Sequence, residues 1–219
     1  IHAGPEIGVA STKAFLGQLL VLYILCLKIS KTRKDLDEKK YLKLIENLIK
    51  LPDSLKTVLK VENKVQVMAK EFITAKGAMF LGRGSSFPIA LEGALKLKEL
   101  SYLHAEGYPA GEMKHGPLAL IEEGLPVIII APKDKYFEKT LSNMQEVMAR
   151  GGKILFLTDH EKNLLNENIR FGVRVPSLDN FLSPILLTIP LQLLAYHVAL
   201  LNNCDIDKPR NLAKSVTVE

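Results

Sequence analysis

Short apolar runs alternate with segments of helical periodicity over the second half of the chain. Each run is bounded by Gly, Pro or Asp, and the runs lie at 78–81, 127–131, 154–157 and 173–175. Segments in which apolar residues recur every three or four positions lie between or after them, at 87–103, 136–150 and 182–201. Strands that are apolar on both faces are typical of a parallel sheet covered by helices on both sides. The pattern therefore predicts an α/β fold with a doubly wound, mainly parallel sheet.

The first half of the chain has helical periodicity from 36 to 72. Apolar residues such as Ile45, Leu48 and Ile49 recur at spacings of three and four, with Lys and Glu between them. Pro52 interrupts this pattern, and a proline inside a helix removes a backbone donor and clashes with the preceding turn. The sequence therefore predicts two helices here, separated at Pro52.

Two apolar stretches resemble membrane-spanning helices in length or composition. The first, 14–27, is uncharged but contains Gln18, and its length is typical of a buried core helix. The second, 180–204, is uncharged and long enough to span, but it contains two prolines, a glutamine and a histidine, and no basic cluster flanks it. We expect a buried or interface helix that begins with Ser183 as N-cap and Pro184 in the first turn, and no membrane partner.

Composition and charge narrow the classes of partner. Apolar residues make up 47% of the chain and charged residues 24%, as in folded globular domains. The net charge is +5, but only six of the 29 basic residues are Arg, and Trp is absent. Nucleic-acid-binding proteins use Arg for bidentate contacts and aromatic rings for stacking, so this composition argues against that class. Cys26 and Cys204 lie in apolar runs without metal-ligand spacing, which indicates buried thiols in a reducing, cytoplasmic setting. We expect no nucleic acid, metal ion or cofactor.

The segment 82–86 follows a predicted strand and opens a predicted helix. Its glycines allow close approach of the backbone to a ligand, and the N–H groups of a helix start attract anions. Phe87 stands where a dinucleotide fingerprint has its third glycine. A tight turn and an anion site are both compatible with these residues.

Lys96 and Glu99 are three residues apart and share one face of a predicted helix. Their spacing favours an exposed ion pair over a carboxylate base held beside an ammonium. The following segment, 104–117, holds two His, two Glu, three Gly and two Pro residues, which is typical of a functional loop. Glu112 and His115 have the spacing of a carboxylate metal motif, but the second copy that such sites need is missing.

The residues at the two chain ends favour simple structural roles. Ser11 and Thr12 precede an apolar helix and predict a cap, with anion or hydroxyl binding as the alternative. The last eleven residues, 209–219, have the composition of a frayed basic tail.

Taken together, these segments resemble one known family. The runs 3–15, 81–117 and 209–219 are similar to the isomerase half of the glutamine–fructose-6-phosphate aminotransferases, which consists of two sugar-isomerase (SIS) domains. The resemblance extends from end to end of the chain and implies a flavodoxin-like sandwich. The implied parts are the closing part of an incomplete first SIS domain at 1–36, connecting helices at 37–72, a second SIS domain at 73–208 and an active-site tail at 209–219.

The resemblance also implies three catalytic residues. Glu99 matches the base that moves a proton between C1 and C2 of the sugar, and His115 matches a histidine that assists ring opening from the neighbouring subunit. Lys214 matches the lysine that forms a Schiff base with the open-chain ketose. These residue types suit the chemistry, because a lysine imine acidifies the adjacent hydrogens, a carboxylate can shuttle a proton between neighbouring carbons, and imidazole exchanges protons near neutral pH.

Substrate contacts are implied in the same way. Val9 and Ser11 match positions that line the sugar, Lys96 lies beside the base, and Ala213 matches a contact immediately before the imine lysine. Glu6 lies near the first two positions, and the resemblance leaves its role open.

The implied activity is conversion of fructose 6-phosphate and glutamine-derived ammonia to glucosamine 6-phosphate by a cytoplasmic homodimer. The sequence contains neither the glutaminase domain of full family members nor the phosphate loop of their first SIS domain, so we expect this fragment to be inactive alone. A stand-alone SIS isomerase or deaminase is one alternative, against which the tail motif argues. A phosphosugar-sensing SIS binding module is another, which a helix-turn-helix segment would favour, and the sequence shows none.

Overall fold

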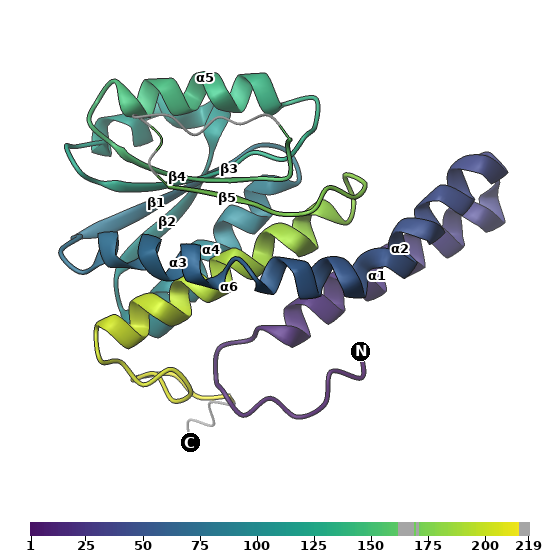
Figure 1. Cartoon of the computed structure of the whole chain (residues 1–219), viewed down its shortest axis with the longest axis horizontal. Helices are drawn as coiled ribbons and strands as arrows, with labels where there is room; N and C mark the ends of the chain where they lie inside the picture. Colours follow the sequence, from purple (N-terminus) through teal and green to yellow (C-terminus); the bar gives the residue numbers. More distant parts are fainter. Residues whose placement is uncertain (162–168, 170, 215–219) are drawn as a thin grey trace.

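Five parallel strands form the sheet at the centre of the structure, a computed structural model that describes residues 1–161, 169 and 171–214. The strands are β1 (Gly77–Gly82), β2 (His104–Pro109), β3 (Pro126–Ile130), β4 (Lys153–Thr158) and β5 (Phe171–Arg174). Their order is β2-β1-β3-β4-β5, and each neighbouring pair is parallel (Figure 1). The direction of winding reverses between β1 and β3. The doubly wound parallel sheet predicted from the apolar runs is confirmed.

Helices cover both faces of the sheet and make a three-layer sandwich (Figure 1). On one face lie α3 (Glu62–Ala69), α4 (Ser86–Ser101) and α6 (Ser183–Leu201), and on the other lie α5 (Phe137–Met148) and the 3-10 helices η2 (Ala110–His115) and η3 (Pro117–Leu120). Alternate residues of β3 serve the two layers, Ile128 and Ile130 on the α4–α6 side and Val127 and Ile129 on the α5 side. All four are fully buried, which explains why this strand is apolar throughout.

The segment 104–117 is not a loop over its whole length, which corrects our interpretation of it. Its first six residues form the edge strand β2, in which His104 pairs with Gly77 and Pro109 with Gly82 of β1. Ala105 is buried, whereas His104 is exposed. Because an edge strand borders solvent along one side, it tolerates polar residues that hide the strand pattern.

Helix α2 (Glu38–Leu59) continues without a break through Pro52, so the predicted separation into two helices is wrong. Leu51 and Val58, which lie on either side of the proline in the sequence, are buried in the core. Pro52 costs the helix one backbone hydrogen bond, but packing of this apolar face holds the helix together. Beyond α2, α3 and the 3-10 helix η1 (Lys70–Phe72) lead to β1.

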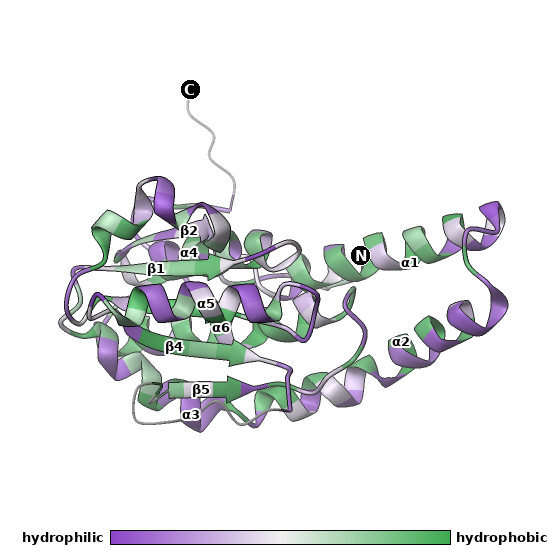
Figure 2. Cartoon of the chain, turned by 90° about the horizontal axis from the view of Figure 1, so that it is seen from above, coloured by the Kyte–Doolittle hydropathy of each residue, from purple (hydrophilic) through white to green (hydrophobic). Residues whose placement is uncertain are grey.

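Helix α1 (Lys13–Arg33) forms a hairpin with α2 that extends beyond the sandwich (Figures 1 and 2). We expected a buried core helix at 14–27, but within α1 only Tyr23 and Leu27 are buried. Cys26 is also exposed and Cys204 is half-buried, so the prediction of two buried thiols is wrong. The described residues leave an apolar surface of α1 uncovered, whose exposed large side chains are Val21, Leu22, Ile24, Leu25 and Ile29.

Both α1 and α6 are long and apolar enough to cross a membrane by length and composition. In the apolar 18-residue stretch of α6, however, 67% is buried inside the protein, against 11% in the corresponding stretch of α1. Helix α6 therefore has the burial of a core helix. Leu182 rather than Ser183 occupies the N-cap position of α6. The Ser183 hydroxyl instead donates a hydrogen bond to the buried carboxylate of Asp159.

Gly93 marks a close approach of α4 to its neighbours and provides a test of this packing. A Cβ at Gly93 would lie 2.9 Å from Leu191 Cδ1 of α6 and 2.9 Å from Phe80 Cε1 of β1. We expect Gly93→Ala to lower the free energy of unfolding by about 1–3 kcal/mol, because both neighbours must shift. Gly17→Ala in α1 is the matched control, since its Cβ would have ordinary contacts at 3.6 Å or more and should raise the free energy of unfolding by about 0.5–1 kcal/mol. Urea unfolding measures both variants, and equal stabilities would contradict the packing.

Candidate active site

Helix α4 carries three charged residues along one side. Glu92, Lys96 and Glu99 follow one another at spacings of four and three. Lys96 is only 2% exposed, because α4 packs against β1, β2 and α6. Its Nζ lies 2.5 Å from Glu99 Oε2 and 3.6 Å from Glu92 Oε1. The exposed ion pair that the spacing favoured is therefore wrong, and the ammonium is instead enclosed by the fold.

The surroundings give the two glutamates different properties. Burial raises the pKa of Glu92, an effect that Lys96 opposes and that the charge of Glu99 reinforces. Glu92 Oε1 has no hydrogen-bond partner among the described residues. The Glu99 side chain is 21% exposed and is hydrogen-bonded to Lys96. Of the two carboxylates, Glu99 is the one that a substrate can reach more easily.

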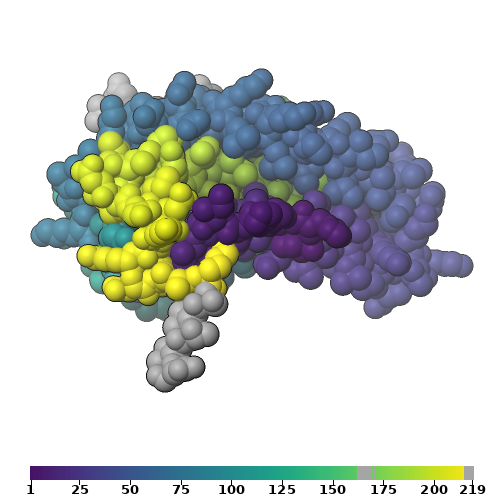
Figure 3. Space-filling model, turned by 90° about the horizontal axis from the view of Figure 1, so that it is seen from below, coloured from purple at the N-terminus to yellow at the C-terminus, as the bar shows by residue number. Residues whose placement is uncertain are grey.

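The carboxyl-terminal tail folds back onto the loop that precedes α1. Figure 3 shows the two segments, yellow and purple, side by side on one surface. Lys214 Nζ donates to Glu6 Oε2 at 2.7 Å and to the backbone oxygens of Gly8 and Val9 at 3.0 and 3.3 Å. The Val9 N–H donates in turn to the backbone oxygen of Asp207 at 2.9 Å. Up to Lys214 the tail is thus held by the body of the protein and is not frayed, while 215–219 lie outside the described residues.

Glu6 connects this lysine to the start of α1. Its Oε1 accepts hydrogen bonds from the backbone N–H groups of Ala14 at 3.1 Å and Thr12 at 3.4 Å. The hydrogen bond from Lys214 lowers the pKa of the Glu6 carboxyl, burial opposes this shift, and the two backbone donors add to it. The sequence placed Glu6 near the sugar contacts without a role, and the structure makes it a partner of Lys214.

A second contact joins the tail to the helix that carries Glu99. The Arg210 N–H donates to Tyr102 Oη at 2.8 Å, and the guanidinium carbon lies 4.1 Å from the centre of the Tyr102 ring. Tyr102 ends α4 in the left-handed conformation, with φ of 62°, three residues after Glu99. Sequence reasoning missed Tyr102, because no local pattern reveals which distant segment a tyrosine at a helix end contacts.

The remaining sugar contacts expected from the sequence lie beside these groups along the chain. Ser11 is half-buried between Val9 and α1, and Ala213 is exposed immediately before Lys214. Among the hydrogen bonds and ion pairs of the described residues, none joins Lys214 directly to Glu99. The tail and the carboxylate on α4 are linked through Tyr102 instead.

The contacts of His115 are separate from those of Glu99 and Lys214. It ends η2, its side chain is 76% exposed, and its Nε2 lies 3.8 Å from Glu112 Oε2. Within the part of the chain that the structure describes, no hydrogen bond or ion pair joins His115 to Glu99 or Lys214. The same part contains no group of three or more His, Cys, Asp or Glu side chains that could hold a metal ion.

The segment 82–86 makes a tight turn between β1 and α4. A Cβ at Gly82 would lie 2.3 Å from the backbone oxygen of Ser86, and one at Gly84 would lie 2.7 Å from the Tyr136 ring. Gly84 also has a φ of +54°, which favours glycine. Turn geometry and packing therefore account for both glycines, which favours the structural interpretation of this segment.

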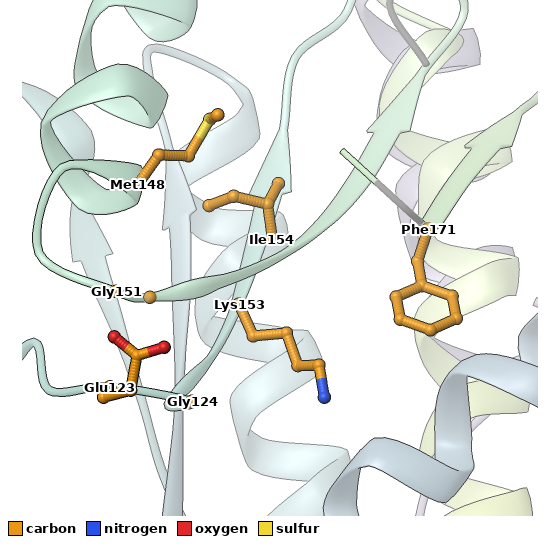
Figure 4. A pocket seen from close by; sticks show the side chains of 8 residues that line it. Glu123, Gly124, Met148, Gly151, Lys153, Ile154 and Phe171 are labelled. Atoms are coloured by element: carbon orange, nitrogen blue, oxygen red, sulfur yellow. The ribbon is translucent and has the colours of Figure 1, made fainter. Parts of the chain in front are cut away.

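One cavity of about 310 Å³ lies beside the loop before α1, and its lining includes Glu6, Lys13, Gln192, Tyr196 and Asp207. Another, also of about 310 Å³, lies at the start of β4 and is lined by residues that include Glu123, Gly151, Lys153 and Phe171 (Figure 4). The second cavity contains none of the site residues expected from the sequence. The first adjoins the contact of Lys214 with Glu6, so we place the candidate site on that side of the molecule.

The raised pKa of Glu92 predicts a pH-dependent effect of its removal. A carboxyl whose pKa is raised by folding stabilises the native state below its unfolded pKa, near 4.5, and loses that contribution as the pH rises through the folded value. We therefore compare the free energy of unfolding of Glu92→Gln with that of the unsubstituted protein at each pH. The variant's value minus the unsubstituted protein's value should be larger at pH 7 than at pH 4. Urea unfolding at both pH values measures this difference, with Glu46→Gln on the exposed face of α2 as control. A difference that is the same at both pH values would show that burial does not raise the pKa of Glu92.

Proteins named glutamine–fructose-6-phosphate aminotransferase (isomerizing) are similar to the chain over its whole length. The one from Bartonella henselae is 52% identical over 219 residues, which covers 100% of the chain and 36% of the relative. The one from Bordetella pertussis is 54% identical over 218 residues, with the same coverage of 100% and 36%. The chain therefore spans about a third of the length of these curated relatives.

Solved structures agree in fold. The C-terminal domain of glucosamine-fructose-6-phosphate aminotransferase from Francisella tularensis matches with a TM-score of 0.91 and 44% identity, covering 95% of the chain and 58% of that structure. The glucosamine-6-phosphate deaminase from Thermotoga maritima matches with a TM-score of 0.70 and 27% identity, covering 96% of the chain and 58% of that structure.

The SIS domain family matches residues 71–202. This range contains the five strands described above and the helices α4, α5 and α6 that cover them. The chain therefore belongs to the SIS domain family, and it corresponds to part of the isomerase half of the aminotransferases that it resembles from end to end.

Proposed function

We propose that the chain forms the carboxyl-terminal isomerase part of an enzyme that makes glucosamine 6-phosphate from fructose 6-phosphate and glutamine-derived ammonia. The observation that carries this proposal is the return of the tail, which holds Lys214 against Glu6, Gly8 and Val9. A frayed tail would have no such contacts. The similarity to named aminotransferases over the whole chain supports the same substrate and reaction.

In the proposed reaction, the neutral Lys214 amine attacks C2 of the open-chain ketose. A C–N bond forms, the carbonyl oxygen leaves as water, and the resulting iminium acidifies the C1 hydrogens. Ammonia then adds at C2 and displaces the Lys214 amine, which leaves a C2 iminium on the open-chain sugar. Glu99 takes a proton from C1 and returns it at C2, and loss of the O1 proton leaves the C1 aldehyde and the C2 amine. The ammonium of Lys96, 2.5 Å from Glu99, supplies positive charge beside the carboxylate when it is ionised. Val9, Ser11 and Ala213 line the sugar.

His115 acts in this proposal on the ring-closed sugar in the site of a neighbouring subunit of a homodimer. Its exposed side chain, whose contact among the described ion pairs is with Glu112, is compatible with a role outside its own chain. An imidazole there can exchange a proton with a hydroxyl of the sugar ring near neutral pH.

The rest of the proposed enzyme accounts for the uncovered face of α1. We place the closing part of a first SIS domain at 1–36, connecting helices at 37–72, the second SIS domain at 73–208 and the active-site tail at 209–219. The apolar side chains of α1 then pack against the remainder of the first SIS domain, and a glutaminase domain of the same longer cytoplasmic chain supplies ammonia. Without these parts, we expect residues 1–219 alone to be inactive.

A deaminase is the second candidate, because the Thermotoga maritima protein named as one shares the fold at 27% identity. The higher identity of 52% to aminotransferases and the contacts of Lys214 favour the first proposal. Release of ammonia from glucosamine 6-phosphate, without any glutamine-dependent synthesis in the full-length enzyme, would favour the deaminase.

Glu99→Gln tests the proposed base in a full-length enzyme that ends in this chain. The amide keeps the shape of the carboxylate but cannot accept the C1 proton, so exchange of the C1 hydrogen with solvent should fall by about 10²–10⁴-fold. Binding of fructose 6-phosphate should be retained, and Glu46→Gln should leave both unchanged. Exchange at the original rate in Glu99→Gln would show that Glu99 is not the base.

Borohydride trapping tests the imine lysine in the same enzyme. With fructose 6-phosphate, reduction should give a covalent adduct on Lys214, located by peptide mass. Lys214→Arg keeps the charge but cannot form the imine, so it should give no adduct and no product, whereas Lys208→Arg nearby in the sequence should behave like the original enzyme. An adduct on another lysine, or full activity after deletion of 209–219, would refute this role.

A further inference from the structure

The Glu6 carboxylate lies where three parts of the structure meet. Its own segment is the loop before α1, its Oε1 accepts the backbone N–H groups of Ala14 and Thr12, and its Oε2 accepts the Lys214 ammonium. The Glu6 side chain is only 13% exposed, and it lines the cavity beside this loop. Both oxygens are thus used, one toward the helix start and one toward the tail.

The surroundings of Lys214 Nζ suit a charged ammonium. Its three acceptors are one carboxylate oxygen and the backbone oxygens of Gly8 and Val9. These three acceptors match the three N–H donors of an ammonium, whereas attack on a carbonyl needs a free lone pair on the nitrogen. The contact therefore has the chemistry of a resting position, in which the lysine is held beside the loop before it reacts.

We propose that Glu6 is a positioning residue that docks the tail and places Lys214 for imine formation. The inference rests on the proposed function, because it assigns Lys214 the reacting amine. The backbone N–H groups of Thr12 and Ala14 at the start of α1 hold Glu6 in place. Through Glu6, the loop that carries Val9 and Ser11 therefore sets the position of the end of the tail. A charged hydrogen bond of this kind is strong enough to change the docked fraction of the tail by about tenfold or more.

The tail offers an internal control for this proposal. Arg210 is held separately by Tyr102, so loss of the Glu6 carboxylate should free Lys214 while Arg210 stays docked. Trypsin reports on both sites, since it cleaves after each of these residues. Cleavage after Lys214 releases 215–219, and its rate measures how well the Lys214 contact is held.

Three variants of the full-length enzyme separate charge from shape. Glu6→Gln keeps an oxygen for Ala14 and Thr12 but removes the negative charge, and Glu6→Asp restores the charge on a shorter side chain. Glu46→Gln removes a carboxylate from an exposed ion pair with Lys43 on α2 and is the matched control.

We expect tryptic cleavage after Lys214, without sugar present, to be about tenfold faster in Glu6→Gln than in the unsubstituted enzyme. Cleavage after Arg210 should be unchanged. The rate of borohydride-trapped adduct formation with saturating fructose 6-phosphate should fall by about the same factor, with partial recovery in Glu6→Asp and no change in Glu46→Gln. The thermal unfolding midpoint should move little, because the docked segment is short.

Several outcomes would overturn the proposal. Unchanged cleavage and trapping in Glu6→Gln would show that Glu6 does not position the lysine, and equal losses in Glu6→Asp and Glu6→Gln would show that shape, not charge, matters. A fall in trapping explained by a lowered unfolding midpoint would assign Glu6 to stability. The variant Lys214→Arg separates failure of the Glu6 proposal from failure of the proposed function. If borohydride still traps an adduct in Lys214→Arg, Lys214 is not the imine lysine, whatever the Glu6 variants show.

Discussion

The buried ammonium of Lys96 is the constraint on which the candidate site depends. A charge that is 2% exposed is tolerated only when partners lie close to it, and here Glu99 and Glu92 lie 2.5 and 3.6 Å away on the same helix. Those distances are fixed because α4 is wedged between the sheet and α6, with Gly93 allowing the close approach. The Glu99 carboxylate, the proposed base, is thus positioned by the core of the protein, and a change in core packing acts directly on the candidate site.

The other half of the site has a different physical character. Lys214 and Val9 come from the two ends of the chain and are held by a small number of hydrogen bonds at the surface. Segments with few buried apolar contacts open more readily than a core helix does. A carboxylate on a core helix combined with a docked tail suits the proposed reaction, in which Glu99 stays fixed while Lys214 forms and releases a covalent bond to substrate.

Two surfaces are largely left open by the residues that the structure describes. The apolar side of α1 is exposed, and the His115 side chain points to solvent. An apolar patch of this kind is typical of an interaction surface. Since the curated relatives extend well beyond the region that the chain matches, both surfaces fit a larger assembly of the kind proposed above.

The sequence by itself determined the parallel sheet, because strands such as β3 are apolar on both faces and their pattern is local. It also determined the family through long motifs. Tertiary structure decided what no local pattern records: that Lys96 is buried, that α2 continues through Pro52, and that Glu6 meets Lys214 from the far end of the chain. Periodicity shows which face of an element avoids water, whereas the identity of the neighbour that covers that face depends on residues distant in sequence.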